Sequence, residues 1–145
     1  MIVIIDIDNT LALNKKRFKE CTDENGKIDW ESVYEYERVI SDIPNIPMID
    51  LTKRYFKSGY KVVIFTGRPD SVKDVTEKWL EDNGVMYHEL HMRTKDDHYI
   101  KADILKKKMY NMFIDDMVLC AYDDEQDIID LWISLGIPSF KVYIP

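Results

Sequence analysis

The sequence predicts an α/β fold in which a doubly wound parallel sheet carries helices on both faces. Short runs of branched apolar residues alternate along the chain with longer segments of helical periodicity, the pattern of parallel βαβ units. The 145 residues are 46% hydrophobic, which suffices for one packed core and is too little for two domains of ordinary size. We therefore expect residues 1–145 to form a single domain.

Five apolar runs are candidates for the strands of this sheet. Each is short and rich in branched or aromatic residues. In a sheet of this kind ligands collect at the carboxyl ends of the strands, near the point where the strand order reverses, so functional side chains should directly follow the strands. The predicted strands are Ile2–Ile7, Tyr60–Phe65, Val85–Leu90, Val118–Tyr122 and Phe140–Ile144.

Helices are predicted between these strands from the residues that begin and end helices. Pro47 suits a first helical turn, and Gly59 can end the same helix. Asp70 is a candidate cap for a helix that ends before Gly84. Two more helices are expected, one over Lys101–Asn111 and one on the apolar spacing Ile128, Leu131, Trp132 and Leu135, ended by Gly136.

One segment, Leu13–Asn45, does not fit the alternation. It is charged, it contains Gly26 and Pro44, and a helix is possible around Trp30–Ile40. We interpret residues 13–45 as a small cap or flap inserted after the first strand.

The composition restricts partners and location. A formal net charge of -7 disfavours extended non-specific binding to nucleic acid, although recognition of one end needs only a few local cations. The opening residues carry no basic lead and reach Asp6 after four apolar residues, so we expect no signal peptide, no membrane span and a cytoplasmic protein. Cys21 and Cys120 lie far apart without a CxxC pattern, which favours reduced thiols over a disulfide and argues against a zinc site.

Acidic residues follow two of the predicted strands. Asp6 and Asp8 end the first strand, where a period of two places both carboxylates on one face and a nearby cation is needed to offset their repulsion. Asp123 and Asp124 follow the fourth strand. The pair Asp115–Asp116 is a rival, but it would lie at the amino end of that strand, away from the site. Hard oxygen donors from neighbouring strand ends favour Mg²⁺.

Two further groups could contact a phosphoryl oxygen. Thr66, Gly67 and Arg68 follow the second strand and offer a hydroxyl, a flexible backbone and a guanidinium. Lys101 opens a helix, and Asp97 lies one helical turn before it. The run 106–108 is interpreted as a solvated lysine face.

The ordered set Asp6-x-Asp8-x-Thr10, Thr66-Gly67-Arg68, Lys101 and Asp123-Asp124 resembles the four motifs of the haloacid dehalogenase (HAD) superfamily. Within it, the chain is similar to the 3′-phosphatase domain of phage polynucleotide kinase. That closer likeness rests on the segment 42–60, on residues 121–132, on Arg17 and on the pair Asp97 and Lys101. No GxxxxGK[ST] phosphate loop accompanies it, so no kinase activity is expected of these residues.

The resemblance implies a HAD-like Rossmannoid fold and a phosphomonoesterase reaction. Asp6 would be the covalent nucleophile, and Asp8 the general acid and base, a role that favours a raised pKa. Mg²⁺ would be held by Asp6, the Asp8 carbonyl, Asp123 and Asp124. The groups expected to hold the phosphoryl oxygens or contribute to substrate binding are Thr66, Gly67, Arg68, Lys101, Arg17 and Asp97.

The expected substrate is the 3′-phosphate end of a nucleic acid or a nucleotide. The same catalytic residues would also serve a small-molecule phosphatase such as a 5′-nucleotidase, and a non-catalytic binding protein is a third reading. Asn9 departs from the family, which commonly has glycine there, and the segment after Arg17 is longer. The sequence leaves the oligomeric state and the choice between DNA and RNA open.

Overall fold

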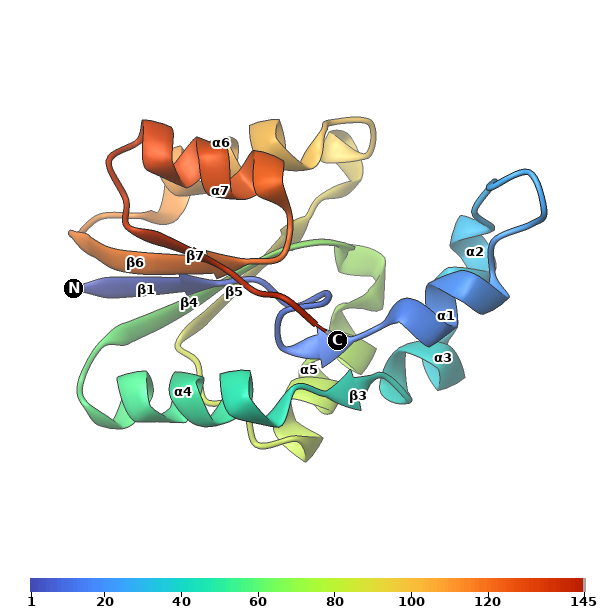
Figure 1. Cartoon of the computed structure of the whole chain (residues 1–145), viewed down its shortest axis with the longest axis horizontal. Helices are drawn as coiled ribbons and strands as arrows, with labels where there is room; N and C mark the ends of the chain where they lie inside the picture. The colour runs from blue at the N-terminus through green and yellow to red at the C-terminus, as the bar shows by residue number, and fades with distance from the viewer. Residues whose placement is uncertain (145) are drawn as a thin grey trace.

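A five-stranded parallel sheet lies between two helical layers in the computed structural model, which describes residues 1–144 (Figure 1). The predicted α/β architecture is confirmed. The strand order β5-β4-β1-β6-β7 reverses beside β1, the first strand of the chain. A site is therefore expected at the carboxyl end of β1. The strands are β1 (Ile2–Ile5), β4 (Lys61–Pro69), β5 (Glu89–Arg93), β6 (Val118–Asp123) and β7 (Ser139–Lys141).

The helices form one layer on each face of the sheet (Figure 1). On one face lie α4 (Ile46–Lys57) and α5 (Lys73–Asp82), and on the other lie α6 (Ala102–Phe113) and α7 (Gln126–Ser134). Pro47 stands in the first turn of α4, as predicted, and Gly59 ends that connection at a φ of 85°, where a side chain would be strained. Asp70 does not cap a helix: it begins a short 3₁₀ helix, η1 (Asp70–Val72), without a side-chain cap bond.

The apolar strands are buried on both faces because each face packs against a helical layer. Alternate residues of β1 divide between the layers: Val3 and Ile5 pack with Trp79 of α5, whereas Ile2 and Ile4 pack with Trp132 of α7. The same period of two extends along β4, and it decides which way the polar residues at the strand ends point.

Three predicted boundaries differ from the structure. The third strand is Glu89–Arg93 and not Val85–Leu90, because Val85 is buried in the connection that follows α5, before the chain reaches the sheet. The strand β4 continues through Thr66-Gly67-Arg68, which the sequence analysis placed in the turn after it. The last strand ends at Lys141, earlier than predicted.

The insertion after β1 forms a cap beyond the carboxyl ends of the strands (Figure 1). Two short antiparallel strands, β2 (Ala12–Leu13) and β3 (Ile43–Pro44), bring its ends together. Between them lie α1 (Lys15–Glu20), α2 (Trp30–Val33) and α3 (Tyr36–Ile40), so the single helix considered for residues 30–40 is two short helices. Within residues 1–144, no helix is long and apolar enough to cross a membrane.

Candidate active site

Asp6 lies directly after β1, and its side chain forms a buried ion-pair cluster with Lys106 and Asp123. The Lys106 ammonium donates to Asp6 Oδ1 at 2.7 Å and to Asp123 Oδ2 at 2.6 Å. All three side chains are almost fully buried. Burial opposes the charge of Lys106, but the two carboxylates outweigh it and raise the Lys106 pKa. The lysine is therefore a fixed cation between the ends of β1 and β6.

Asp6, Asp123 and Asp124 form a group that could hold a metal ion. One oxygen of each lies within 4.8 Å of the others. Burial raises the pKa of Asp6 well above its usual value, and the neighbouring carboxylates of Asp123 and Asp8 add to the effect although Lys106 opposes it. Burial, with Asp123 beside it, also raises the pKa of Asp124 to about 6. When all three carboxyl groups are ionised, the single ammonium leaves two negative charges uncompensated, which fits a divalent cation with oxygen ligands.

Lys106, and not Lys101, is the lysine that contacts the acidic cluster. Lys101 is exposed and directly precedes α6, without a side-chain hydrogen bond to the start of the helix. The interpretation of residues 106–108 as a solvated face is wrong for Lys106, which is 4% exposed. A helical signal for its burial is present in the sequence: Lys106 follows Ala102 by four residues and precedes Met109 by three, so it lies on the inner side of the helix.

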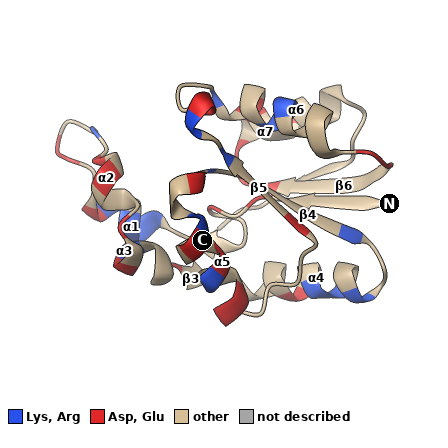
Figure 2. Ribbon diagram, turned by 180° about the vertical axis from the view of Figure 1, so that it is seen from behind, with Lys and Arg blue, Asp and Glu red and all other residues tan. Residues whose placement is uncertain are grey.

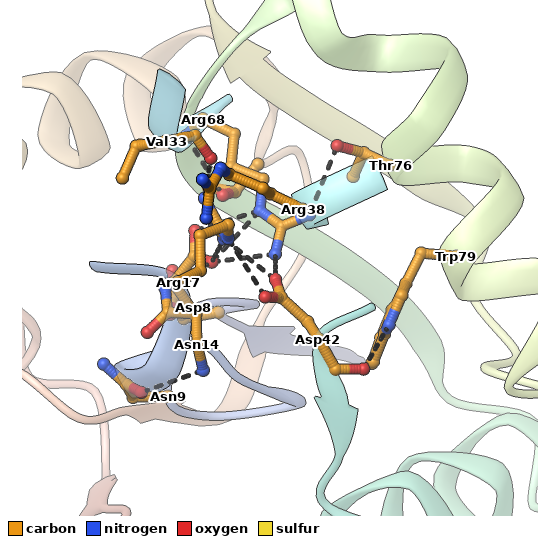
Figure 3. Close-up of polar contacts among 12 residues, drawn as sticks. Asp8, Asn9, Asn14, Arg17, Val33, Arg38, Asp42, Arg68, Thr76 and Trp79 are labelled. Carbon is orange, nitrogen blue, oxygen red and sulfur yellow. Dashed lines mark hydrogen bonds and ion pairs between the residues drawn. The ribbon is translucent and has the colours of Figure 1, made fainter. Parts of the chain in front are cut away.

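Asp8 belongs to a second network of charged side chains, with Arg68, Arg17 and Asp42 (Figure 3). Arg68 donates from Nε to both oxygens of Asp8 at 3.1 Å and from Nη2 to Asp8 Oδ1 at 2.8 Å. The same Nη2 reaches Asp42 Oδ2 at 2.9 Å. Arg68 points this way because it shares the face of β4 that packs on α5, where Nη1 contacts Thr76.

Arg17 joins the same network from the cap. It donates to both oxygens of Asp42 at 3.0 and 2.8 Å and to Asp8 Oδ1 at 3.3 Å. The sequence analysis expected Arg17 and Arg68 to hold phosphate, but both guanidiniums are buried against carboxylates. Asp42, which was not among the predicted site residues, belongs to the cap like Arg17, and its ion pair with Arg68 of β4 links the cap to the sheet.

The electrostatics of Asp8 differ from the expectation of a raised pKa. Burial alone would raise it, but Arg68 and then Arg17 stabilise the carboxylate, so the pKa of Asp8 is lowered. The two arginines also fix the orientation of the carboxyl group, and Asn14 donates to it at 2.9 Å. Asp6 and Asp8 are thus separated in environment although the sequence places them two residues apart.

Asn9 follows Asp8 in the chain and stands in the turn that leads to the cap. Its φ is 57°, in the left-handed region, and it is the one non-glycine residue with positive φ among residues 1–144. Asparagine tolerates this conformation better than most residues do. Asparagine can therefore form the tight turn at a position where the sequence resemblance led us to expect glycine.

Of the other predicted residues, some line the cleft and others make contacts elsewhere in the structure. Thr66 is buried, and its hydroxyl accepts from the backbone N–H of Arg68. Gly67 faces the cleft described below. Asp97 pairs with Lys108 at 2.6 Å and not with Lys101. Asp115 and Asp116 lie at the amino end of the sheet, where Asp116 pairs with the chain's amino terminus, so they are at the edge opposite Asp6 and Asp123.

A cleft of about 1320 Å³ lies between the cap and the carboxyl edge of the sheet. Asp6, Asp8, Lys106 and Asp124 line one part of it. Basic residues occur on α1 and between β5 and α6, on either side of this edge (Figure 2). The cap contributes aromatic side chains to the same cleft, which the sequence analysis did not single out.

The family model described as "Polynucleotide kinase PNKP phosphatase domain" matches residues 1–144. The chain belongs to this family. It is accordingly a HAD-superfamily phosphatase, and the family resemblance seen in its sequence is confirmed. HAD phosphatases generally use a divalent metal, and the three-aspartate group of this PNKP-type phosphatase domain could hold one.

Several solved structures are similar to the structure of this chain. A chain of the Pnkp1/Rnl/Hen1 RNA repair complex is 30% identical with a TM-score of 0.79; the match covers 97% of this chain and 42% of that one. A hydrolase from Streptococcus pneumoniae TIGR4 gives 15% identity, TM-score 0.64 and coverages of 99% and 92%. The D,D-heptose 1.7-bisphosphate phosphatase from B. bronchiseptica, solved with magnesium and phosphate, is 11% identical with a TM-score of 0.59. The match covers 97% of this chain and 79% of that one. The last two share the fold alone.

Proposed function

We propose that this chain is a Mg²⁺-dependent phosphomonoesterase that acts through an aspartyl phosphate on Asp6 and removes 3′-phosphates from nucleic-acid ends. The observation that carries the proposal is the position of Asp6 at the carboxyl end of the central strand, beside Lys106, Asp123 and Asp124. Asp6, Lys106 and Asp124 line one cleft. A nucleophilic carboxylate needs an adjacent cation to approach a phosphate dianion, and Lys106 supplies one.

The proposed reaction has two displacements. An oxygen of Asp6 attacks phosphorus, the bond from phosphorus to the ester oxygen breaks, and Asp8 gives its proton to the leaving oxygen. Water then attacks the aspartyl phosphate, Asp8 takes a proton from it, and inorganic phosphate leaves as Asp6 is regenerated. Arg68 and Arg17 hold Asp8 in one orientation. They also lower its pKa, so the acid step requires Asp8 to take up a proton before it can protonate the leaving oxygen.

Asp6, Asp123 and Asp124, with the backbone carbonyl of Asp8, would hold the Mg²⁺ ion. When bound, the ion reduces the repulsion between the carboxylate nucleophile and the phosphate. Lys106 contacts one oxygen of Asp6 and one of Asp123, so oxygens of the cluster remain for a cation.

The substrate class is supported by the family and by the charge distribution. The matching family is a polynucleotide kinase phosphatase domain, and the similar chain comes from an RNA repair complex, although this chain spans only 42% of it. Lys15, Lys95 and Lys101 line the cleft of a chain whose net charge is -7. Cations gathered at one cleft are what recognition of a single nucleic-acid end requires.

The test compares three substrates at equal concentration, with Mg²⁺ and with EDTA: an oligonucleotide 3′-phosphate, its 5′-phosphate isomer and a 5′-mononucleotide. We expect the highest kcat/KM for the 3′-phosphate and no turnover in EDTA. Asp6→Asn should abolish turnover and leave the far-ultraviolet circular dichroism unchanged, since the substitution is isosteric.

Each part of the proposal can fail separately. Faster hydrolysis of the 5′-mononucleotide would assign a nucleotidase activity instead. Full activity in EDTA would refute the metal requirement. Substantial activity of a folded Asp6→Asn protein would refute the covalent step, which can otherwise be observed as a phosphorylated Asp6 by mass spectrometry after acid quench.

A further inference from the structure

Three aromatic side chains of the cap form a wall of the catalytic cleft. Phe18 comes from α1, Trp30 from α2, and Tyr34 directly follows α2. Trp30 lies edge-on to Phe18, with ring centroids 6.1 Å apart, and nearly parallel to Tyr34 at 6.2 Å. Arg17 lies over the rings of Phe18 and Tyr34, so this aromatic wall continues into the network that holds Asp8.

Trp30 is less buried than a purely structural role would require. Phe18 and Tyr34 are half-buried, but Trp30 is 56% exposed while lining the cleft. A tryptophan that served only to join α1 to α2 would bury most of its ring, because that burial is the main stabilising contribution it can make. Much of its surface is instead available to a ligand in the cleft.

The groups around the aromatic wall favour one chemical class of ligand. Asp6, Asp124 and Lys106 line the same cleft, where the proposed reaction places the terminal phosphate. Lys15, Lys95 and Lys101 line it as well, and none of the three forms an ion pair within residues 1–144. Exposed cations beside an aromatic surface are the arrangement by which proteins bind single-stranded nucleic acid.

We propose that Trp30 stacks on the unpaired base of the 3′-terminal nucleotide, and that this contact makes the enzyme prefer single-stranded ends. The inference rests on the proposed 3′-phosphatase function and names the subsite that would select its substrate. A base stacked on the cap cannot remain paired with a complementary strand, so a blunt duplex end is expected to be the poorer substrate.

The test measures kcat/KM on two single-stranded oligonucleotides of equal length with a 3′-phosphate, one ordinary and one whose last nucleotide is abasic. Stacking on an aromatic side chain contributes enough affinity that its loss should lower kcat/KM by about 5- to 150-fold, mainly through KM. We expect this loss in the wild-type protein on the abasic substrate and in Trp30→Ala on the ordinary one. Trp30→Ala should lose little more on the abasic substrate, because the two changes remove the same contact.

Two further variants separate stacking from folding. Trp30→Phe keeps a ring and should retain most of the activity on the ordinary substrate. Tyr36→Ala is the matched control, since Tyr36 is an exposed aromatic residue of the same cap that does not line the cleft, and it should behave as wild type.

The inference is overturned if the wild-type protein hydrolyses the abasic and ordinary substrates equally well, a comparison that needs no variant. It is also overturned if Trp30→Ala loses the same factor on both substrates. In either case a clear preference for 3′-phosphate over 5′-phosphate would leave the proposed function standing. If the wild-type protein shows no such preference, the proposed function fails first.

Discussion

The buried lysine of α6 offers a sharp test of the site's electrostatics through Lys106→Met. Methionine keeps the length and apolar stem of the side chain but removes both hydrogen bonds, to Asp6 at 2.7 Å and to Asp123 at 2.6 Å. Each bond to a charged group contributes roughly 1.5–3 kcal/mol. Removing one partner of a buried ion pair costs about 3–5 kcal/mol, because the remaining carboxylates lose their compensating charge.

This loss can be measured by urea unfolding in EDTA. With a slope of about 2 kcal/mol/M, the midpoint should fall by roughly 2 M, which leaves a folded protein if its stability is typical. Added Mg²⁺ should narrow the gap, since the cation binds the folded state and replaces part of the missing positive charge. Phosphatase activity should fall about 10²-fold or more, as for loss of one group that stabilises transition-state charge.

Lys107→Met is the matched control, because Lys107 is exposed on the same helix. Its free energy of unfolding should change by no more than about 0.5 kcal/mol. If Lys106→Met were as stable and as active as Lys107→Met, the assignment of Lys106 as the cation of the site would be refuted.

Three further substitutions test other parts of the structure. Asp123→Ala should steeply raise the Mg²⁺ concentration needed for half-maximal activity, or end activity. Asp115→Ala, at the opposite edge of the sheet, should respond to Mg²⁺ like the wild-type protein. If the two variants had the same Mg²⁺ requirement, the metal site would be contradicted. Arg68→Lys removes the guanidinium that contacts the carboxylates of Asp8 and Asp42, so the free energy of unfolding in urea should fall by about 2–4 kcal/mol and kcat should decrease. An unchanged unfolding midpoint would count against the network. Asn9→Val places a branched residue at a φ of 57° and should lower the free energy of unfolding by about 1–3 kcal/mol. Asn9→Gly should stay within about 1 kcal/mol of wild type. If urea unfolding showed the glycine variant to be the less stable of the two, the backbone argument would be refuted.

The residues at the strand ends were predictable because parallel strands impose their geometry locally. Once Ile2–Ile7 and Val118–Tyr122 are identified as neighbouring strands, Asp6 and Asp123 must lie at the same edge of the sheet. The choice of Asp123–Asp124 over Asp115–Asp116 follows from strand direction as well, because only the first pair lies at the carboxyl end of its strand. No long-range information is needed for these steps.

The lysine contact was not predictable in the same way. Lys101, Lys106 and Lys107 all stand on or beside one helix, and the sequence pattern of α6 only weakly separates its inner from its outer face. Which lysine meets Asp6 depends on the rotation and translation of α6 over the sheet. Packing of Leu105 and Met109 into the core sets that placement.

The sequence by itself determined the α/β class, the carboxylates at the ends of β1 and β6 and the presence of a cap, since hydrophobic period and strand direction are local properties of the chain. Only the tertiary structure decided the partners of those groups. Arg68 and Arg17 contact Asp8 directly, and both also contact Asp42, a residue 25 positions from Arg17 and 26 from Arg68. Such contacts arise because the cap folds back over the sheet and burial forces each charge to find an opposite one, a requirement that sequence spacing does not encode.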